Sequence, residues 1–560
     1  MKAALFNESF PPVIDGVSNV VLNYADILSR TPGTEAVVAT PRYPDTDYEK
    51  YPFGVVPYRS MAASELTGGY RTGNPFDMEA LTQLVSFKPD ILHAHSPATA
   101  VLMARIVRQA ADAPLVYTYH TKYDIDIART VKGELLQKEA IRALVENVSA
   151  CDEVWAVSRG AGDNLRSLGY EGNVRVMANG VDFPKGEAEP ELVREVTKDF
   201  DLPEDVFMFL FVGRLVNYKG LPLILDALRL LSDDGEDFRM VFVGNGDDAA
   251  SLKETALSYG FRVDAKRPDG VIEHLGTASS RSGKIIFAGA ERDRTKLRAW
   301  NTRADLFLFP STFDTNGLVV REAAACALPS VLVRGSCAAE GVADGRNGYL
   351  IAENAGSMHQ LLRELISDRE AVHKAGQHAM GELYMSWETC VANARDRYEA
   401  VIELKKSGAF AGHKKVAADY FLGFTSDLTK QYLNVIDRSR TFVDGMQGNA
   451  HEIAQGTRNL TRGVQETAQG IARGVQESTQ EIARGVQETA QNLAKGVQET
   501  AQGIARDMQD IAVGEAERRI RESQEFHRNL LDMHESRAQA EENVREFRQM
   551  LERLKTLLIS

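Results

Sequence analysis

The sequence lacks several features that would place the protein in a membrane, outside the cell or on nucleic acid. It contains no run of about 18 apolar residues, so no segment is predicted to cross a membrane as a helix. The start, MKAALFNESFPP, has a short apolar run that is broken at Asn7 and Glu8, which fits a buried first strand rather than a signal peptide. The formal net charge is −14, which argues against general nucleic-acid binding.

Cysteine and proline are scarce, and their distribution is informative. The last proline is Pro329, so the absence of proline from the following 231 residues permits long helices there. From Lys405 onward 22 basic residues balance 22 acidic ones, which assigns the negative excess to the first 404 residues. No CxxC spacing occurs and the surroundings are apolar or mixed, so we expect reduced, structural thiols and a cytoplasmic protein. The four cysteines are Cys151, Cys326, Cys337 and Cys390.

The first 404 residues alternate short apolar runs with helical patterns, which is typical of parallel sheets covered by helices. This pattern predicts an α/β protein with two doubly wound domains, residues 1–190 and 191–404, and ligands bound where strand carboxyl ends face a cleft. The strands expected in the first domain are residues 2–6, 35–40, 90–96, 115–120, 153–158 and 174–180. Those expected in the second are residues 207–213, 239–244, 284–289, 305–311 and 330–335.

The segment GRLVNYKG, residues 213–220, follows one of these strands and places two cations at the sheet edge. Gly213 allows the backbone to pass close to a ligand, and the charges of Arg214 and Lys219 suit a diphosphate. The alternative is a pair of solvated basic residues, which is common at this spacing.

The stretch PSTFDTNGLVVREAAACALP, residues 310–329, carries two carboxylates on either side of a glycine. Gly317 opens an apolar helix whose free N-terminal amides and dipole favour an anion. Asp314 lies just before the helix and Glu322 one to two turns inside it, so the two acids would suit the hydroxyls of a sugar and of a ribose. Taken alone, the pattern also fits a capped helix with an ordinary exposed Glu322.

In order and spacing, these motifs resemble family 4 glycosyltransferases of the GT-B fold, which are retaining enzymes that use nucleotide-sugars. The resemblance implies two Rossmann-like domains that face a cleft. It extends over nearly 390 residues, through FPPVIDGVSN (10–19), HAHSP (93–97), YTYHTKYD (117–124), AVSRGAGDNL (156–165), NGVD (179–182), GRLVNYKG, VGNGDD (243–248), residues 309–329, GVADGRNGYLI (341–351) and SWETCVANARDRYEAVI (386–402).

The resemblance also implies roles for individual residues. Gly16 would let the backbone approach the donor phosphate and the transferred sugar, and His120 would contact that sugar at the catalytic centre. Arg214 and Lys219 would stabilise the departing diphosphate, an electrostatic task that works best in a closed, dry cleft. The remaining donor-binding positions are Gly213 and the backbone amides of Asn316, Gly317, Leu318 and Val319.

Asp314 and Glu322 match the two acids of the family's E-x7-E pattern, which contact the donor sugar and the ribose hydroxyls. The family usually has Glu at the first position, and the missing methylene shortens the reach by about 1.5 Å, so the sugar must sit closer or be a different sugar. The resemblance implies front-face substitution with retention, in which the leaving phosphate helps to deprotonate the acceptor. It implies no metal, and we expect His93 and His95 to shape the cleft rather than bind zinc.

An eleven-residue unit, GVQETAQGIAR and its variants, repeats from Gly463 to Arg506. At about 3.67 residues per turn, its second, sixth and ninth positions form one narrow apolar stripe. Glycines within the repeats cost about 1 kcal/mol each relative to alanine, so this helix needs a surface to fold upon. Three states stay open: coiled-coil self-association, an amphipathic helix on a membrane, and a disordered spacer. Self-association is favoured because four basic and five acidic residues give anionic lipid little to attract.

Three segments are expected beyond residue 404, namely a helical connector (405–450), the repeat helix (451–517) and an amphipathic or coiled-coil helix (518–560). The aromatic-rich connector is interpreted as a helix docked on the catalytic part. A lipid-facing helix is the alternative, and it would bring the active site to a lipid acceptor.

The sequence therefore predicts a cytoplasmic, retaining hexosyltransferase at the inner face of the membrane, with UDP-glucose as the first donor to test. Because YHTKYD resembles family members that glucosylate diacylglycerol, a membrane lipid is the first acceptor, and a polysaccharide or small molecule is the alternative. We expect homo-oligomers through the C-terminal helices, peripheral membrane contact and no nucleic-acid partner. The alternative function is a nucleotide-sugar-binding scaffold assembled by its coiled coil.

Overall fold

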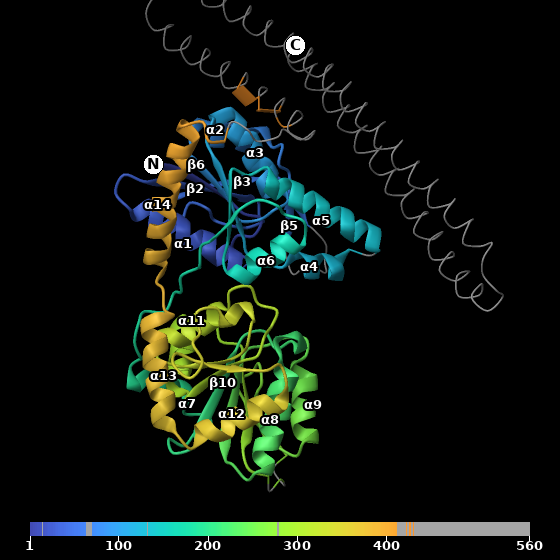
Figure 1. Cartoon of the computed structure of the whole chain (residues 1–560), viewed down its shortest axis with the longest axis vertical. Coiled ribbons are helices and arrows are strands. Elements are labelled where there is room, and N and C mark those ends of the chain that lie inside the picture. Colours follow the sequence, from blue (N-terminus) through green and yellow to red (C-terminus); the bar gives the residue numbers. More distant parts are fainter. Residues whose placement is uncertain are drawn as a thin grey trace, which may run out of the picture. The chain divides into compact units, whose positions relative to one another are not determined.

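The computed structural model describes residues 1–410, except 14, 63–69, 132, 277, 278 and 280, together with residues 422, 425, 426, 429 and 430. The predictions for the repeat helix and the C-terminal helix therefore lie outside the described residues, as does nearly all of the connector. Residues 1–129 and 140–413 form one compact unit. This unit contains two sheet domains, drawn in blue to teal and in green to yellow in Figure 1.

The first domain is a parallel sheet whose seven described strands run in the order β3-β2-β1-β6-β7-β8-β9. Its strands are β1 (Lys2–Phe6), β2 (Glu35–Pro41), β3 (Gly54–Tyr58), β6 (Ile91–Ala94), β7 (Leu115–Tyr119), β8 (Glu153–Ala156) and β9 (Val174–Val176). A separate hairpin pairs β4 (Ser60–Ala62) with β5 (Arg71–Gly73). The helices are α1 (Gly16–Arg30), α2 (Met78–Ser86), α3 (Thr99–Ala111), α4 (Tyr123–Thr130), α5 (Glu134–Ser149) and α6 (Arg159–Ser167).

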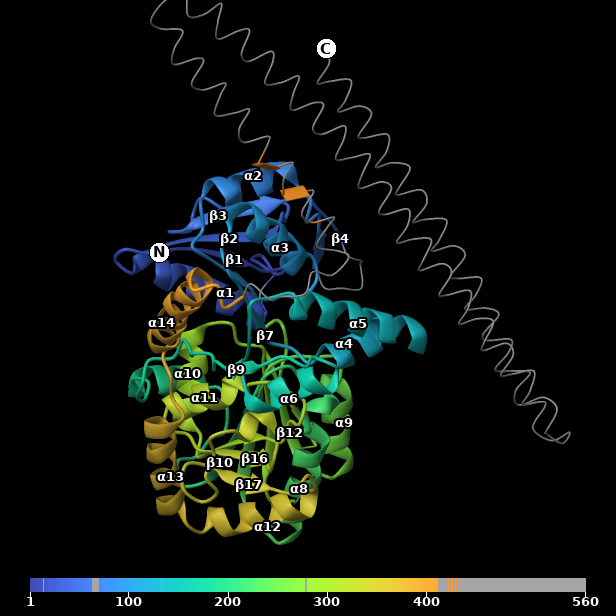
Figure 2. The same ribbon diagram turned by 45° about the horizontal axis from the view of Figure 1, so that its top comes forward.

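The second domain is a sheet whose eight described strands run in the order β13-β12-β14-β11-β10-β15-β16-β17. They are β10 (Phe207–Val212), β11 (Phe238–Val243), β12 (Arg262–Lys266), β13 (Ile272–Leu275), β14 (Lys284–Gly289), β15 (Leu306–Phe309), β16 (Ser330–Val333) and β17 (Tyr349–Ile351). Its helices are α7 (Pro190–Thr197), α8 (Leu221–Asp233), α9 (Ala249–Ser258), α10 (Arg294–Arg303), α11 (Leu318–Ala325), α12 (Ala355–Ile366) and α13 (Arg369–Glu382). Helices α8 and α12 lie side by side in this domain (Figure 2).

Strand order determines where a ligand can enter each sheet. In the first sheet β1 pairs with β2 on one side and β6 on the other, and in the second β10 lies between β11 and β15. Chain connections leave such a central strand in opposite directions, which opens a crevice at its carboxyl end. The segments that follow β1, β6, β10 and β15 therefore occupy the positions from which a cleft can be built.

The expected strands are confirmed at the sheet centres, where near-continuous apolar runs are buried on both faces. The strands that the pattern missed are β3, β4, β5, β12, β13 and β17, which lie at sheet edges or in the hairpin, except β12. They are short or polar: β12 reads RVDAK, β13 reads IEHL and β17 has only three residues. The antiparallel pairing of β12 with β13 was likewise not predicted.

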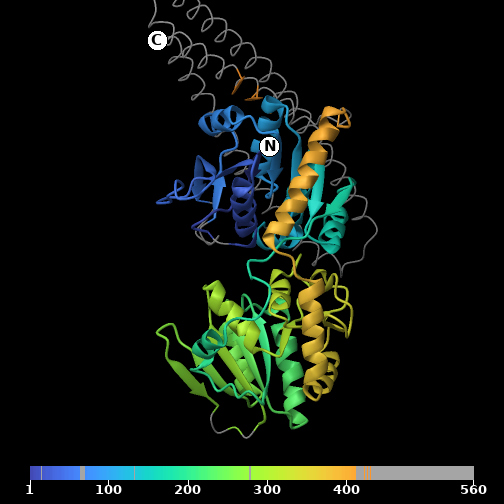
Figure 3. The same ribbon diagram turned by 90° about the vertical axis from the view of Figure 1, so that its left-hand side faces the viewer.

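Helix α14 (Trp387–Lys406) corrects the predicted boundary of the second domain at residue 404. It packs on the core of the first domain, beside α1, and Figure 3 shows it in orange along that domain while α13 remains on the other. Trp387 and Tyr398 are buried in one cluster with Val20 and Tyr24 of α1. The apolar face of α14 therefore completes a core whose other residues lie far away in the sequence. The helical spacing of apolar residues in α14 does not show where that face packs.

The chain crosses between the two domains twice, and the crossings touch. The backbone N–H of Val181 donates to the carbonyl oxygen of Met385 over 3.0 Å. Close approach explains Gly180, since a Cβ there would lie 2.6 Å from backbone atoms of Trp387. The two segments thus meet at one joint beside the start of α14.

Two expectations from the sequence can be compared with the described residues. Within the part that the structure describes, no helix combines the length and apolarity needed to cross a membrane. The four cysteines are free and buried, as predicted for structural thiols.

Replacing Tyr398 with Phe should lower the free energy of unfolding by about 1–3 kcal/mol, because it leaves a buried ring nitrogen without a partner. The Tyr398 hydroxyl lies 2.5 Å from Nδ1 of His93, whose Nε2 lies 2.6 Å from Oγ1 of Thr118. Urea denaturation measures the change. As a control, Tyr259→Phe removes a less buried hydroxyl from Asp226 and should cost less. Equal stability of Tyr398→Phe and the parent protein would contradict the docking of α14 through this residue.

Candidate active site

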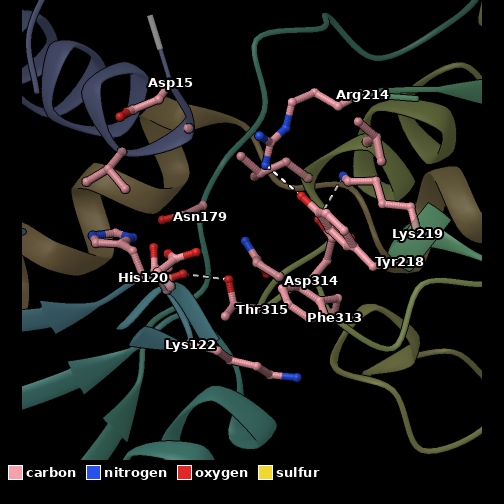
Figure 4. A pocket seen from close by; sticks show the side chains of 18 of the residues that line it. Asp15, His120, Lys122, Asn179, Arg214, Tyr218, Lys219, Phe313, Asp314 and Thr315 are labelled. Atoms are coloured by element: carbon pink, nitrogen blue, oxygen red, sulfur yellow. Dashed lines mark hydrogen bonds and ion pairs between the residues drawn. The ribbon is translucent and has the colours of Figure 1, made fainter. Parts of the chain in front are cut away.

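A cavity of about 380 Å³ lies at the carboxyl ends of the central strands, between the two sheet domains (Figure 4). The first domain contributes residues after β1 and β7, and the second contributes residues after β10 and β15. The polar residues that line it are Asp15, Tyr70, His120, Thr121, Lys122, Asp126, Asn179, Arg214, Tyr218, Lys219, Asp314, Thr315 and Asn316. Val17, Phe313 and the segments at Gly16 and Gly317–Val319 complete the lining.

Arg214 and Lys219 both line the cavity, as predicted. They follow β10, with Lys219 in the one-turn 3-10 helix η2 (Asn217–Lys219). The Arg214 guanidinium donates from Nη2 to the hydroxyl of Tyr218 over 2.9 Å. Two cations thus lie along one wall, where they favour a group with two or more negative charges.

Lys219 forms an ion pair with Asp314 inside the cavity, with Nζ 3.1 Å from Oδ1. The two side chains are only 12% and 25% exposed, so each charge needs the other while no ligand is bound. The second carboxylate oxygen of Asp314 accepts a hydrogen bond from the Ser311 hydroxyl over 2.6 Å. Asp314 is therefore held at the cavity wall by two donors.

The start of α11 faces the cavity, as its glycine predicts. Gly317 has φ +58° and ψ +52°, a left-handed conformation, and a Cβ would lie 2.9 Å from Cβ of Ala338. No side chain caps this helix, and its first residues, Gly317–Val319, line the cavity, so its first amides have no side-chain partner and can serve a ligand.

Asn316 supplies a stronger indication that the cavity binds a polar ligand. Its side chain is 6% exposed, and in the structure neither its amide oxygen nor its amide nitrogen has a hydrogen-bond partner among the described residues. Leaving a buried amide unsatisfied costs about 1–3 kcal/mol, which a bound ligand with hydroxyl or phosphate oxygens would recover. The prediction used only the backbone of this residue.

His120 lines the cavity and is backed by a second histidine. Its Nε2 lies 3.0 Å from Nδ1 of His95, and the two rings stack at 5.2 Å. Burial lowers the pKa of His120 to about 3, and burial followed by neighbouring imidazoles lowers the pKa of His95. Neutral His120 can therefore contact a sugar hydroxyl without adding charge. His93 and His95 are fully buried and do not line the cavity, so the expectation that they shape it stays a prediction.

Glu322 and Gly213 do not line the cavity, in contrast to the other predicted site residues. Glu322 lies in α11 and its Oε1 accepts a hydrogen bond from Nη2 of Arg294 over 2.5 Å. Gly213 directly follows β10 with φ +148°, and a Cβ there would lie 3.8 Å from the Lys219 amine. Gly16 does line the cavity, with open space where a Cβ would stand.

Hydrogen bonds cross the cavity mouth and hold the two domains together. The Thr315 hydroxyl donates to the carbonyl oxygen of His120 over 2.5 Å. The Ser158 hydroxyl donates to the backbone carbonyl oxygen of Thr315, also over 2.5 Å. Lys122 donates from Nζ to the carbonyl oxygen of Thr312 over 3.1 Å. Small hydroxyl residues after strand ends carry no distinctive sequence signal, so these contacts were not predicted.

A second cavity of about 620 Å³ opens at the carboxyl ends of β11 and β14 in the second domain. Its walls include Leu215, Asn245 and Trp300, and the backbone at Ala288 and Gly289. Charged side chains such as Lys253, Lys266 and Glu291 also line it, so this cavity combines apolar and polar walls.

The structure gives no indication of a metal centre in the part of the chain that it describes. No three His, Cys, Asp or Glu side chains there are arranged to hold an ion. The expected independence from metal stays a prediction.

Asp15 and Tyr70 are further cavity residues that the sequence did not reveal. Asp15 caps α1 in a capping box with Ser18, and its Oδ2 accepts a hydrogen bond from the Tyr70 hydroxyl over 2.6 Å. A helix-capping Asp is so common that the sequence offered no reason to select it. Its position directly before Gly16 is the only signal that could have done so.

Comparison with known proteins identifies two matching families. Residues 14–184 match the model described as Glycosyltransferase Family 4, and residues 207–368 match Glycosyl transferases group 1. An alpha-monoglucosyldiacylglycerol synthase of Acholeplasma laidlawii is 23% identical over 66% of this chain and 88% of its own length. A sulfoquinovosyl transferase of Arabidopsis thaliana is 26% identical over 72% of this chain and 74% of its own.

A solved structure supports the fold at low sequence identity. HepE of Anabaena in complex with UDP is 17% identical and covers 71% of this chain and 100% of its own, with a TM-score of 0.55. Its two-domain fold is the one described here.

Gly317→Ala should destabilise the protein more than Gly335→Ala. Both glycines have positive φ, so both substitutions carry the left-handed penalty of about 1–2 kcal/mol. Only at Gly317 does the new Cβ meet another atom within 4 Å, which adds a packing cost of about 1 kcal/mol or more. Denaturation of both variants measures the difference. Equal losses in the free energy of unfolding would contradict the prediction, because they would mean that Ala338 moves aside at no cost.

The buried histidines predict a loss of stability in mild acid. Because the folded protein holds His95 and His120 below the ordinary pKa of 6.5, the unfolded chain binds more protons below that pH. The free energy of unfolding should therefore fall as pH decreases from about 6.5, by up to about 1.4 kcal/mol per pH unit for each histidine. In His95→Asn, which retains a polar partner for His120, the fall should be shallower. Parallel stability curves for the two proteins would refute this.

Proposed function

We infer that this chain, a hexosyltransferase of the GT-B family 4 type, moves glucose from UDP-glucose to a hydroxyl of diacylglycerol with retention of configuration. A nucleotide-sugar donor follows from its similarity to glycosyltransferases along both domains. Glucose and diacylglycerol are proposed because relatives in Acholeplasma laidlawii and Streptococcus pneumoniae are alpha-monoglucosyldiacylglycerol synthases.

The donor diphosphate would lie between Arg214 and Lys219 on one side and the start of α11 on the other. Both features line one cavity, and both favour negative charge. The sugar would then extend toward His120 and Asp314, and the base toward the cavity at the ends of β11 and β14. Glu322 would contact the ribose between them.

The reaction would use the leaving phosphate as the base. The bond between the anomeric carbon and the phosphate oxygen breaks, and the acceptor oxygen bonds to the same face of the sugar. The proton of the acceptor hydroxyl passes to a phosphate oxygen of the departing UDP. The two cations stabilise the negative charge that builds up on the diphosphate in the transition state.

Asn316 carries this proposal most directly. It is a buried side chain at the helix start with two unpartnered polar atoms among the described residues, beside two cations, and it suits the oxygens of a bound sugar phosphate. Lys219 would exchange its pairing with Asp314 for the phosphate, which frees the carboxylate for a sugar hydroxyl.

Peripheral contact with the membrane is part of the proposal, since diacylglycerol resides in the bilayer. We propose that the C-terminal segments beyond residue 410 contribute either this contact or self-association. Flotation of the full chain with vesicles containing diacylglycerol, compared with vesicles that lack it, tests the contact.

Arg214→Met and Lys219→Met should each lower the rate of glucosyl transfer by about 100-fold or more, because each removes a charge that stabilises the leaving group. Transfer of radiolabelled glucose from UDP-glucose to diacylglycerol in mixed micelles measures this, with GDP-mannose as the comparison donor.

Arg363→Met serves as the matched control, since Arg363 is an exposed cation of α12 that lies outside the cavity. Unchanged transfer by folded Arg214→Met and Lys219→Met would overturn the assigned mechanism. Tight UDP binding without turnover of either donor on any acceptor would support a scaffold instead.

A further inference from the structure

We propose that Arg294 is a positioning residue that holds Glu322 for the ribose of the donor and ties it to the joint between the two domains. This inference rests on the proposed function, because it assumes that Glu322 meets a ribose. Nothing in the sequence motifs selects Arg294.

Arg294 and Glu322 form a close ion pair, in which the Arg294 side chain is 41% exposed. Nη2 of Arg294 lies 2.5 Å from Oε1 of Glu322, whose side chain is only 12% exposed. Burial raises the pKa of Glu322, and the Arg294 guanidinium opposes that rise. A ribose hydroxyl needs an ionised, fixed acceptor, so the arginine supplies both the charge balance and the orientation.

Arg294 is itself held in place by the segment that crosses between the domains. Its Nε lies 3.4 Å from Oδ2 of Asp182, and its guanidinium carbon lies 4.6 Å from the centre of the Phe183 ring. A guanidinium with an anion at two sides and an aromatic face beneath has few alternative positions.

Asp182 connects the arginine to the first domain. Its carboxylate accepts hydrogen bonds from the indole Nε1 of Trp387 over 2.7 Å and from the side-chain amide of Asn19 over 3.1 Å. Trp387 begins α14 at the second crossing, and Asn19 lies in α1, the helix that brings Gly16 to the cavity. One chain of contacts therefore runs from α1 through Asp182 and Arg294 to Glu322.

Only one oxygen of Glu322 is engaged by Arg294, which leaves Oε2 for the ligand. Without Arg294, Glu322 would be a buried carboxylate close to Asp182, whose charge raises the pKa of Glu322 further. The ribose contact then weakens, while the diphosphate contacts with Arg214 and Lys219 stay intact. The loss of affinity in a variant without Arg294 should therefore be specific to the ribose.

The test compares binding of UDP with binding of 2′,3′-dideoxy-UDP, measured by titration calorimetry on the full chain. The parent protein should prefer UDP by about tenfold or more, because the hydroxyls bond to a charged acceptor. In Arg294→Met this preference should largely disappear, through weaker binding of UDP and little change for the dideoxy nucleotide. Arg294→Lys should restore part of it.

Two further variants exclude a general structural effect. Arg292→Met removes an exposed cation two residues away, whose side chain forms no hydrogen bond or ion pair with the described residues, and should retain the full preference. The double variant Arg294→Met with Glu322→Gln should show the same preference for UDP as Glu322→Gln alone, since the two residues act through one contact.

The outcomes separate this inference from the proposed function. If the parent protein binds neither UDP nor another nucleoside diphosphate, the proposed function fails and the inference falls with it. If the parent discriminates between the two nucleotides and Arg294→Met discriminates equally well, the inference alone is overturned. Additive losses in the double variant would overturn it as well, because they would mean that the two residues act independently.

Discussion

The balance of charge in the cavity is the constraint on which the site depends. Lys219 is only 12% exposed, and a charge that is so little solvated is costly unless it is paired, so Asp314 neutralises it. Under the proposed function, a diphosphate would take over that pairing. The same lysine would then both hold Asp314 and bind the ligand.

The same constraint gives a physical account of Asp at position 314. The shorter side chain reaches Lys219 and Ser311 at once, and so stays at the wall of the cavity. A glutamate would extend about 1.5 Å farther into the cavity. The residue that departs from the usual family pattern is therefore consistent with a local network, in which Ser311 and Lys219 fix one carboxylate.

Much of the architecture could be predicted from the sequence, for reasons visible in individual segments. Strands such as FMFLFV are buried on both faces, and so their apolar runs are unambiguous. The glycines and cations after strand ends, Arg214, Lys219 and Gly317, could be located because the chemistry of phosphate binding restricts the residue type. Edge strands such as β13 carry polar residues that solvent tolerates, and they left no comparable pattern.

The contacts that the sequence did not predict join segments that lie far apart in the chain. Glu322 was selected from its motif, but its partner Arg294 lies at a helix start and Asp182 in a crossing segment, and no local pattern relates them to it. Helix α14 shows the same limit, since its apolar face matches α1 only after the chain has crossed back to the first domain. Local patterns select candidates for phosphate binding such as Arg214 and Lys219, whereas the contacts made where the chain returns to the first domain leave no local pattern. The joint at Asp182 depends on such contacts, because its carboxylate accepts hydrogen bonds both from the returning helix α14 and from α1.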